Sequence, residues 1–379
     1  MRNGRKPVLT EWQLFCLVLN GMVGIGVFSL AREVGEAAGR SSLLAIPLAG
    51  LLAVLQVTSM YLLAKRFPEQ TISEYAGQIL GRFLGPVYLL GYALAAMTLT
   101  IVVSRSYWLL VSAWTLGKTP QLALLAPMIL VCWNTARRGV VVTARKIELI
   151  NYGGLILMFV LMLPVVPLDW DFVRPVLDNG VSGVLRGILP SIFALAGYDI
   201  LLLVFPYVHS RRTLSVSIFA IALATLFYTV TTLFVLGVLG LEFALLSPWP
   251  LQLYLNRFAS SVFERADVVF LIVWSFQIIN IITISMYTAI SCLVGIWPRR
   301  LDTRRAASFI LLPILIGTAL PIRSAMQRQL SSIYSLIALL YLGTLPFLLW
   351  LLAVLRGKKG EVKDEQKAQG GLSWSPCCC

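Results

Sequence analysis

Three glycines, Gly21, Gly24 and Gly26, fall within six residues of a long apolar run near the start of the chain. Glycine weakens a helix and lets another backbone approach closely. One interpretation is a small-residue surface for close helix packing. The other is an unwound segment of a membrane helix, whose free amides face an anion and whose free carbonyls face a cation or a polar group. On the second interpretation, Gly24, Ile25 and Gly26 contact a ligand.

A second irregular site, Ala196-Gly197-Tyr198-Asp199, places an acidic residue inside another apolar run. A carboxylate at membrane depth is costly, so by default it is a candidate functional residue. The alternative is a structural role for Asp199 as a buried hydrogen-bonding partner. On the functional interpretation, we expect Ala196, Gly197, Tyr198 and Asp199 to bind the ligand from the side opposite the glycines.

A basic residue, Arg105, lies midway along a third apolar run, with Ser104 and Tyr107 beside it. A cation at that depth needs a carboxylate or carbonyl partner, and Asp199 is the obvious candidate. The alternative is an arginine that extends toward an interface, but about twenty residues precede it in the same run. We therefore expect Ser104, Arg105 and Tyr107 to belong to the ligand site.

Three other polar positions have structural explanations. Glu148 follows Arg145 at the start of a helix, where a carboxylate favours the helix N-terminus and can pair with a neighbouring arginine. Gln277 and Asn280 lie about one turn apart inside an apolar run, and we expect them to form hydrogen bonds between helices.

No sequence motif indicates catalysis, since a nucleophile elbow, a zinc-protease motif and a phosphate-binding loop are all missing. His209 is the single histidine, and the six cysteines lack the paired spacing of metal ligands. We therefore expect a protein that is not an enzyme and needs no metal or cofactor.

The elements that position these residues are membrane-spanning helices. Hydrophobic residues make up 58% of the chain and charged residues 13%, a balance that a soluble domain could not bury but that a lipid bilayer accommodates. A spanning helix needs roughly 20 mainly apolar residues. Ten runs qualify: about 12–31, 41–64, 84–114, 121–137, 147–167, 184–208, 213–240, 266–297, 306–322 and 331–355.

The fold class is therefore an all-α polytopic membrane protein. We expect a ten-helix domain over residues 11–355, between an N-terminal tail, 1–10, and a polar, disordered C-terminal tail, 356–379. The two irregular sites lie in the first and sixth helices, five spans apart. Broken helices at matching positions of two inverted five-helix halves indicate a transporter-type binding site.

The basic residues indicate the orientation of the helices. If both termini are cytoplasmic, 21 Lys and Arg residues lie in inner segments and nine in outer ones. This excess predicts an even number of spans with both ends inside. The net charge of +14 comes from short clusters between apolar runs, which suits anionic lipid headgroups and speaks against a nucleic acid partner.

Several motifs together resemble one family. Leu9-Thr10-Glu11-Trp12-Gln13-Leu14-Phe15, and the glycine-rich run that follows it, are similar to the opening of spore germination receptor B subunits, the endospore germination permeases. Further matches are Ala64-Lys65-Arg66-Phe67-Pro68, Ala144-Arg145-Lys146-Ile147-Glu148 and Glu264-Arg265-Ala266-Asp267. The resemblance covers about residues 8–355.

This resemblance implies the amino acid–polyamine–organocation transporter superfamily, with a leucine-transporter-like five-plus-five inverted repeat. It implies a B subunit that binds a small nutrient, such as an amino acid, and signals with A and C subunits in the inner membrane of a bacterial endospore. Where the family usually has Gly-x-Glu, this chain has Gly197-Tyr198-Asp199, which keeps the charge on a shorter arm. An active amino-acid or ion transporter that works by alternating access is the alternative.

Overall fold

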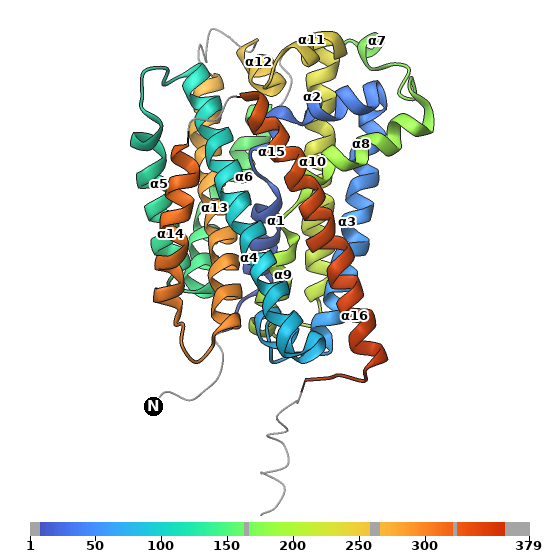
Figure 1. Cartoon of the computed structure of the whole chain (residues 1–379). Coiled ribbons are helices and arrows are strands. Elements are labelled where there is room, and N and C mark those ends of the chain that lie inside the picture. The colour runs from blue at the N-terminus through green and yellow to red at the C-terminus, as the bar shows by residue number, and fades with distance from the viewer. Residues whose placement is uncertain (1–7, 163–166, 258–265, 321–323, 361–379) are drawn as a thin grey trace, which may run out of the picture.

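A computed structural model describes residues 8–162, 167–257, 266–320 and 324–360. These residues form a bundle of long helices that run between two ends of the molecule (Figure 1). Within the described ranges, an isolated bridge between Leu9 and Val208 is the one β contact. The predicted all-α membrane fold is therefore confirmed.

The first predicted span is a broken helix. It consists of α1 (Glu11–Met22) and α2 (Gly26–Ala38). Thr10 starts α1 through a capping box, in which the Thr10 hydroxyl accepts from the Gln13 amide and the Gln13 side chain accepts from the Thr10 amide. Residues 23–25 separate the two helices, so the glycine-rich segment is unwound as predicted.

The sixth predicted span is broken as well. Its first part is α8 (Gly180–Leu195), and its second part contains η2 (Tyr198–Ile200), α9 (Leu201–Val204) and η3 (Phe205–Tyr207). The two parts are bent by 56°. Gly197 has a φ of 120°, a backbone conformation that a residue with a Cβ rarely adopts.

The other predicted spans also coincide with helices. These helices are α3 (Ser42–Lys65), α4 (Ile72–Trp114), α5 (Gln121–Ala136), α6 (Val140–Met162), α10 (Thr213–Leu239), α13 (Ala266–Ile296), α14 (Thr303–Ala319), and α15 (Ser324–Ala338) with η4 (Leu339–Thr344) and α16 (Leu345–Leu355). Among the described residues, five helical stretches are long and apolar enough to cross a bilayer, and the bent pair around Gly197 makes a sixth. The helices that coincide with the ten predicted spans are therefore of unequal length, and the number of passes stays a prediction.

The structure adds elements that hydrophobic runs do not reveal. η1 (Gly39–Ser41), α7 (Trp170–Val173), α11 (Leu241–Leu246) and α12 (Pro250–Asn256) are short helices, of which α7, α11 and α12 lie at the upper end of the bundle in Figure 1. α4 begins twelve residues before the predicted span and is bent at Gly81, which has a φ of 92°. The apolar pattern misses this start because residues 72–83 contain several polar side chains.

Both described ends of the chain lie at the lower end of the bundle in Figure 1, as an even number of passes requires. The Leu9 amide donates to the Tyr207 carbonyl there, and the Gly360 amide donates to the Arg66 carbonyl. Most of the predicted tails, residues 1–7 and 361–379, lie outside the described residues.

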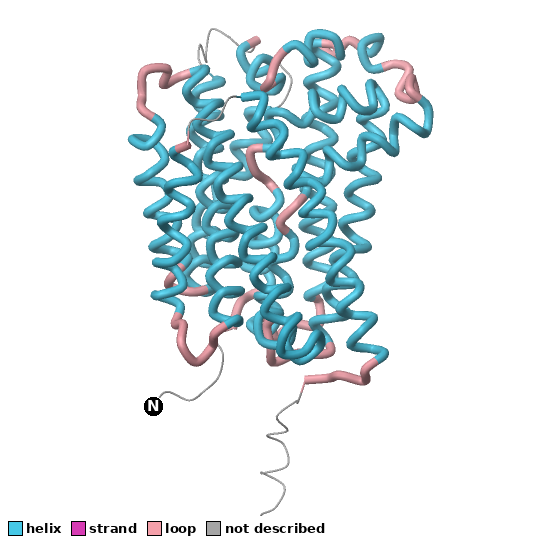
Figure 2. The backbone as a smooth tube through the Cα atoms, viewed as in Figure 1, coloured by secondary structure: helices cyan, strands magenta, loops and turns pink. Residues whose placement is uncertain are grey.

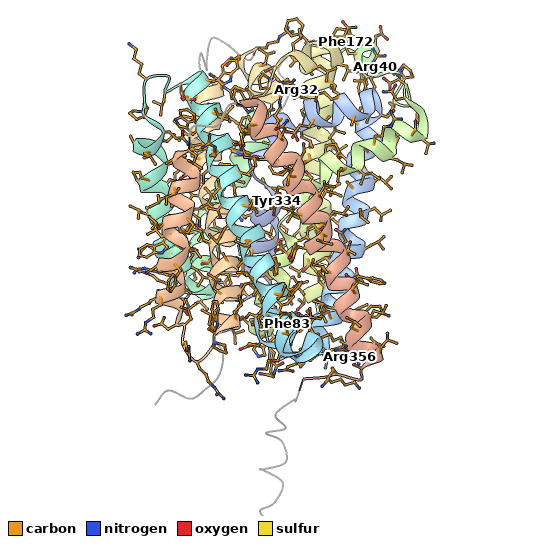
Figure 3. All side chains as sticks on the ribbon, in the orientation of Figure 1. Arg32, Arg40, Phe83, Phe172, Tyr334 and Arg356 are labelled. Carbon is orange, nitrogen blue, oxygen red and sulfur yellow. The ribbon has the colours of Figure 1, made fainter. Side chains whose placement is uncertain are left out.

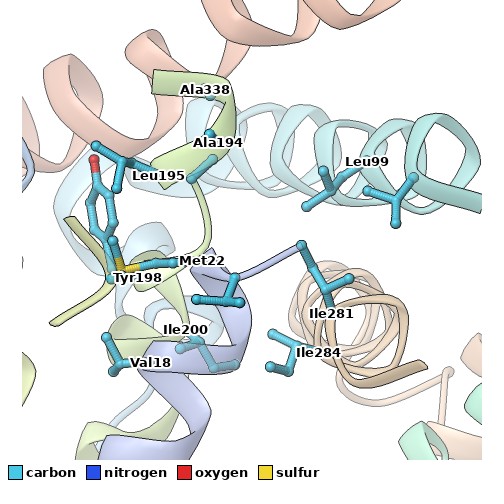
Figure 4. Packing of buried hydrophobic residues seen from close by; sticks show 14 of the residues in the cluster. Val18, Met22, Leu99, Ala194, Leu195, Tyr198, Ile200, Ile281, Ile284 and Ala338 are labelled. Atoms are coloured by element: carbon cyan, nitrogen blue, oxygen red, sulfur yellow. The ribbon is translucent and has the colours of Figure 1, made fainter. Parts of the chain in front are cut away.

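The outer surface of the bundle is strongly apolar, and Figure 3 shows how densely side chains cover it. Phe83, Leu149 and Phe309 are 80%, 75% and 68% exposed. Large apolar side chains at such exposure are costly in water and favourable against lipid tails. The interior is also mainly apolar, and Figure 4 shows Met22, Tyr198 and Ile281 from three separate segments lying around the two breaks.

Candidate ligand-binding site between the two broken helices

The two breaks touch each other through glycine backbone. A Cβ added to Gly21 would lie 2.5 Å from the Gly197 carbonyl oxygen, and a Cβ added to Gly197 would meet the Gly21 carbonyl even more closely. Both positions therefore exclude any side chain. Figure 2 shows the two unwound segments near the middle of the bundle, where they interrupt the helices above and below them.

The first break is held by a tyrosine from α10. The Gly24 amide donates to the Tyr228 hydroxyl at 3.2 Å, and the same hydroxyl donates to the Met22 carbonyl at 2.9 Å. Tyr228 thus satisfies one amide and one carbonyl that the unwinding frees. The Gly24 amide therefore has a protein partner in this conformation.

The neighbours of Gly24 have different surroundings. A Cβ on Gly26 would lie 3.0 Å from Ala194 of α8, so this glycine serves close helix packing. Ile25 borders a cavity above the break. The structural interpretation of the glycine cluster therefore applies to Gly26, and ligand contact by Ile25 stays a prediction.

Asp199 lies just after the second break and borders a small central cavity. Its Oδ2 accepts a hydrogen bond from the Tyr92 hydroxyl of α4. The volume of this cavity is about 20 Å³, which is room for about one water molecule. Gly21, Tyr92, Gly197, Asp199, Ser285 and Thr288 are among the residues that line it.

The other residues of the second break are buried beside the cavity. Ala196 and Tyr198 are each 2% exposed. The Tyr198 hydroxyl points away toward α3, where it donates to the Gln56 side chain. The break thus presents Gly197 and Asp199 to the cavity and uses Tyr198 to anchor itself to α3.

The predicted pairing of Arg105 with Asp199 is wrong. Arg105 is fully buried, and its Nη1 donates to the carbonyls of Thr318, at 3.1 Å, and Leu320. Its Nε donates to Gln327 Oε1 at 3.3 Å. The last carbonyls of α14 lack partners within their own helix and carry partial negative charge, so they can accept from a buried cation without a carboxylate.

The residues beside Arg105 also lie away from the central cavity. The Ser104 hydroxyl donates to the Thr100 carbonyl of its own helix at 2.7 Å. The Tyr107 and Ser275 hydroxyls form a 2.6 Å hydrogen bond that joins α4 to α13. The structure therefore brings together the two breaks, but it leaves Ser104, Arg105 and Tyr107 on a level above them.

The predictions for the polar residues outside the two breaks are confirmed only in part. Asn280 donates to the Asn20 side chain at 2.9 Å, which confirms a hydrogen bond between helices. Gln277 finds no side-chain partner among the described residues. Glu148 accepts from Gln13 at 2.8 Å and from Tyr152 at 2.9 Å, so its predicted pairing with an arginine is wrong.

Sequence reasoning missed several lining residues of the central cavity. Tyr92 is an aromatic residue in an apolar run, and such a residue usually belongs to a core. Ser285 and Thr288 are spaced by three residues on one face of α13, a polar pair that the sequence could have suggested. The Ser285 and Thr100 hydroxyls are 2.9 Å apart.

Two larger cavities lie on either side of the central one. We call them the upper and lower vestibules, because their lining residues come from the parts of helices toward the upper and the lower end of the bundle as drawn in Figure 1. The upper vestibule has a volume of about 190 Å³, and Ile25, Arg32, Glu33, Trp249, Gln327 and Arg328 are among its lining residues. The lower vestibule has a volume of about 700 Å³, and Glu74, Arg138, Tyr207, Tyr287, Ser291 and Thr303 are among its lining residues.

This fold and cavity arrangement define a transporter-type membrane protein. The chain belongs to the spore germination protein family, whose sequence model matches residues 8–329. It is 24% identical over 359 residues to the spore germination protein YndE of Bacillus subtilis (strain 168), covering 93% of this chain and 98% of YndE. It is also 23% identical over 273 residues to the spore germination protein B2 of the same organism, covering 71% of this chain and 74% of that protein.

Solved structures share the fold at low sequence identity. MhsT, in complex with L-phenylalanine, superposes with a TM-score of 0.63 at 13% identity, covering 94% of this chain and all of MhsT. Mhp1, a nucleobase-cation-symport-1 family transporter with bromovinylhydantoin bound, has a TM-score of 0.52 at 12% identity, covering 92% of this chain and 80% of Mhp1. The predicted leucine-transporter-like fold with two broken helices is therefore confirmed, in a family of germinant receptor-like permeases.

Proposed function

We propose that this chain is the B subunit of a spore nutrient-germinant receptor, which binds a small nutrient between its broken helices. One observation carries the proposal: the two broken helices meet at Gly21, in the last turn of α1, and at Gly197, in the second break, beside the half-buried side chain of Asp199. Backbone groups freed at such breaks, together with a carboxylate, suit the charged ends of an amino acid. MhsT, which has the same fold, is solved with an amino acid.

Ligand entry requires a conformational change. The central cavity, about 20 Å³, is too small for any amino acid, so the structure is a closed form. The Phe193 and Tyr334 rings, in edge contact with their centroids 6.0 Å apart, separate the cavity from the upper vestibule. Separation of α8 from α15 at this contact would admit a ligand, and that movement is the signal we propose for the partner subunits.

The A and C subunits are the partners we propose, in the inner membrane of a bacterial endospore with both termini cytoplasmic. Membership in the spore germination family and the excess of basic residues in the inner segments support this assignment. The test is affinity purification of the tagged full chain from detergent-solubilised spore membranes. Recovery of both subunits is expected, and recovery of neither would contradict the assignment.

The second candidate function is active transport of an amino acid or ion by alternating access. The vestibules at opposite ends of the bundle favour it, because a transported ligand needs a path on each side of its site. Uptake of labelled L-alanine and L-phenylalanine by the purified chain in liposomes separates the two functions. Saturable accumulation would favour transport, whereas binding without accumulation would favour the receptor.

A further inference from the structure

The lower vestibule opens to the surface at the end of the bundle that holds both described ends of the chain (Figure 1). Its volume is about 700 Å³, within the range of about 300–1,000 Å³ that is usual for binding pockets. Its lining residues Glu74, Arg138 and Pro298 are exposed, so the cavity is reached from outside the bundle. The lower vestibule is therefore accessible while the central cavity is closed.

Arginines gather around the mouth of this vestibule. Arg138 lines it, and the lining residues Pro298 and Thr303 are each followed in the chain by two arginines. We call the five residues the arginine cluster: Arg138, Arg299, Arg300, Arg304 and Arg305. All five are exposed, and among the described residues none of them is part of an ion pair.

Two carboxylates lie near the cluster, and helix starts engage both. The Asp302 side chain accepts from the Arg304 amide and caps α14. The Glu74 carboxylate lines the vestibule, but it accepts from the Thr71 amide at 2.7 Å in the capping box of α4. The mouth of the vestibule therefore has a net positive charge.

Other arginines at this end of the bundle have protein partners. Arg66 Nε donates to the Lys358 carbonyl at 3.3 Å, and Arg356 Nη1 donates to the Ile79 carbonyl at 2.6 Å. A preference for basic residues on the cytoplasmic side accounts for arginine at this end in general. It does not account for five arginines around one cavity.

The extent of the cluster favours a polypeptide over a small anion. Of its five members, only Arg138, from the connection between α5 and α6, lines the vestibule. The other four lie outside the lining, in the connection between α13 and α14 and in the first turn of α14. An extended acidic chain that enters the vestibule meets both groups. Arginine clusters recognise acidic segments because each guanidinium forms paired hydrogen bonds with a carboxylate.

The wall of the vestibule continues to the central cavity. α13 contributes Ser285 and Thr288 to the central cavity, and Tyr287 and Ser291 to the lower vestibule. Tyr207, which also lines the vestibule, ends η3 in the second broken helix. An occupant of the vestibule therefore contacts the same two elements that border the central cavity.

We propose that the lower vestibule and the arginine cluster form a docking site for an acidic segment of a partner protein. Glutamate and aspartate side chains of that segment pair with the cluster, and its leading end occupies the vestibule. The inference rests on the proposed function, a receptor subunit that signals to partners, and adds the place and the chemistry of that contact. Because α13 lines both cavities, a movement of this helix on nutrient binding reaches the docked segment.

The test is protection of a cysteine inside the vestibule. The full-length chain, with its native cysteines replaced and Ser291→Cys introduced, is reconstituted in phosphatidylcholine nanodiscs and labelled with a water-soluble maleimide. Hexaglutamate should slow the labelling, hexalysine should leave it unchanged, and high salt should weaken the protection. In a second chain, Lys359→Cys places the cysteine at an exposed position outside the vestibule, where hexaglutamate should have no effect.

Charge-neutralising variants locate the contact. Arg138→Gln combined with Arg304→Gln should raise the half-protecting concentration of hexaglutamate about tenfold, because each exposed ion pair contributes a factor of up to about five in affinity. Arg211→Gln combined with Arg212→Gln is the matched control, since it removes the same charge from exposed residues that do not line the vestibule. Equal effects of the two double variants would mean attraction to overall charge alone and would overturn the inference.

Two further measurements identify the occupant. Protection by citrate at the same concentration as hexaglutamate would assign the vestibule to a small anion. Protection in phosphatidylglycerol nanodiscs without any peptide would assign it to lipid headgroups. Either result overturns the inference.

The assay uses the chain alone, so it separates this inference from the proposed function. Absence of protection by hexaglutamate, together with recovery of the A and C subunits on purification, would overturn the inference and leave the proposed function in place. Protection together with recovery of neither subunit would support the docking site and contradict the proposed partners. If a variant fails to fold, the comparison of hexaglutamate with hexalysine on the unsubstituted cluster still decides.

Discussion

The Asp199 carboxylate borders the central cavity and accepts a hydrogen bond from Tyr92, so on the proposed function it meets a ligand there once the cavity opens. We predict that Asp199→Asn slows the germination response about tenfold or more, because a charge-assisted hydrogen bond is lost. Asp199→Glu should retain much of the response, since it keeps the charge. The measurement is germination of spores carrying each variant, with protein abundance checked by immunoblot.

Asp171→Asn is the control for this experiment, because Asp171 is exposed on α7. A normal response from Asp199→Asn at normal abundance would show that the carboxylate has only a structural role.

The contact between Gly21 and Gly197 leaves no room for a methyl group on either residue. We predict that Gly21→Ala and Gly197→Ala each destabilise the protein by about 1–3 kcal/mol, the usual cost of overpacking. Gly197→Ala should be the more severe change, because its φ of 120° adds backbone strain. Thermal unfolding in nanodiscs measures the effect.

Gly77→Ala provides the matched control, since a Cβ at that helical position meets nothing within 4 Å. It should be neutral or slightly stabilising because alanine has the higher helix propensity. Equal stability of all three variants would mean that the two breaks do not touch.

At the scale of elements, Arg105 joins α4 to the end of α14 and to α15. Arg105→Met would remove the donor from the Leu320 carbonyl and from Gln327 Oε1, while the Thr318 carbonyl keeps the Gln121 side-chain amide. An unsatisfied buried group costs about 1–3 kcal/mol. We therefore predict a lower melting temperature for Arg105→Met, because Gln327 also loses its contact with the guanidinium. Arg105→Lys should recover part of the stability, since an ammonium group can still donate to the carbonyls.

Arg186→Gln, on the exposed surface of α8, is the comparison for the loss of a charge alone. A melting temperature for Arg105→Met that matches this control would contradict the anchoring role.

The sequence predicts the elements better than their contacts. Hydrophobic run length locates the spans, and clustered glycines together with a buried acid locate both breaks, because these signals are local. The partner of Arg105 comes from α14, more than 200 residues away along the chain, and is a backbone carbonyl that every residue type possesses. Composition cannot reveal such a partner. The Tyr92 contact with Asp199 was missed for a related reason, since tyrosine in an apolar run gives no sign of which group its hydroxyl meets.

At the scale of the whole molecule, the lower end of the bundle contains the described ends of the chain and the basic connections between helices. We predict that this end faces the cytoplasm. Single cysteines at the exposed positions Lys118 and Arg300, in a background without native cysteines, should differ in reactivity toward an impermeant thiol reagent on intact cells. Cys at 118 should react, and Cys at 300 should react only after the membrane is permeabilised; the reverse pattern would invert the assigned orientation.

The Tyr228 hydroxyl that bridges the first break also limits how tightly a ligand can bind there. A ligand carboxylate reaching the Gly24 amide must displace this phenol, so the free energy of binding contains only the difference between two hydrogen bonds. On the proposed function, a receptor built in this way binds its nutrient with modest affinity, so it responds once the nutrient is abundant rather than at trace concentrations.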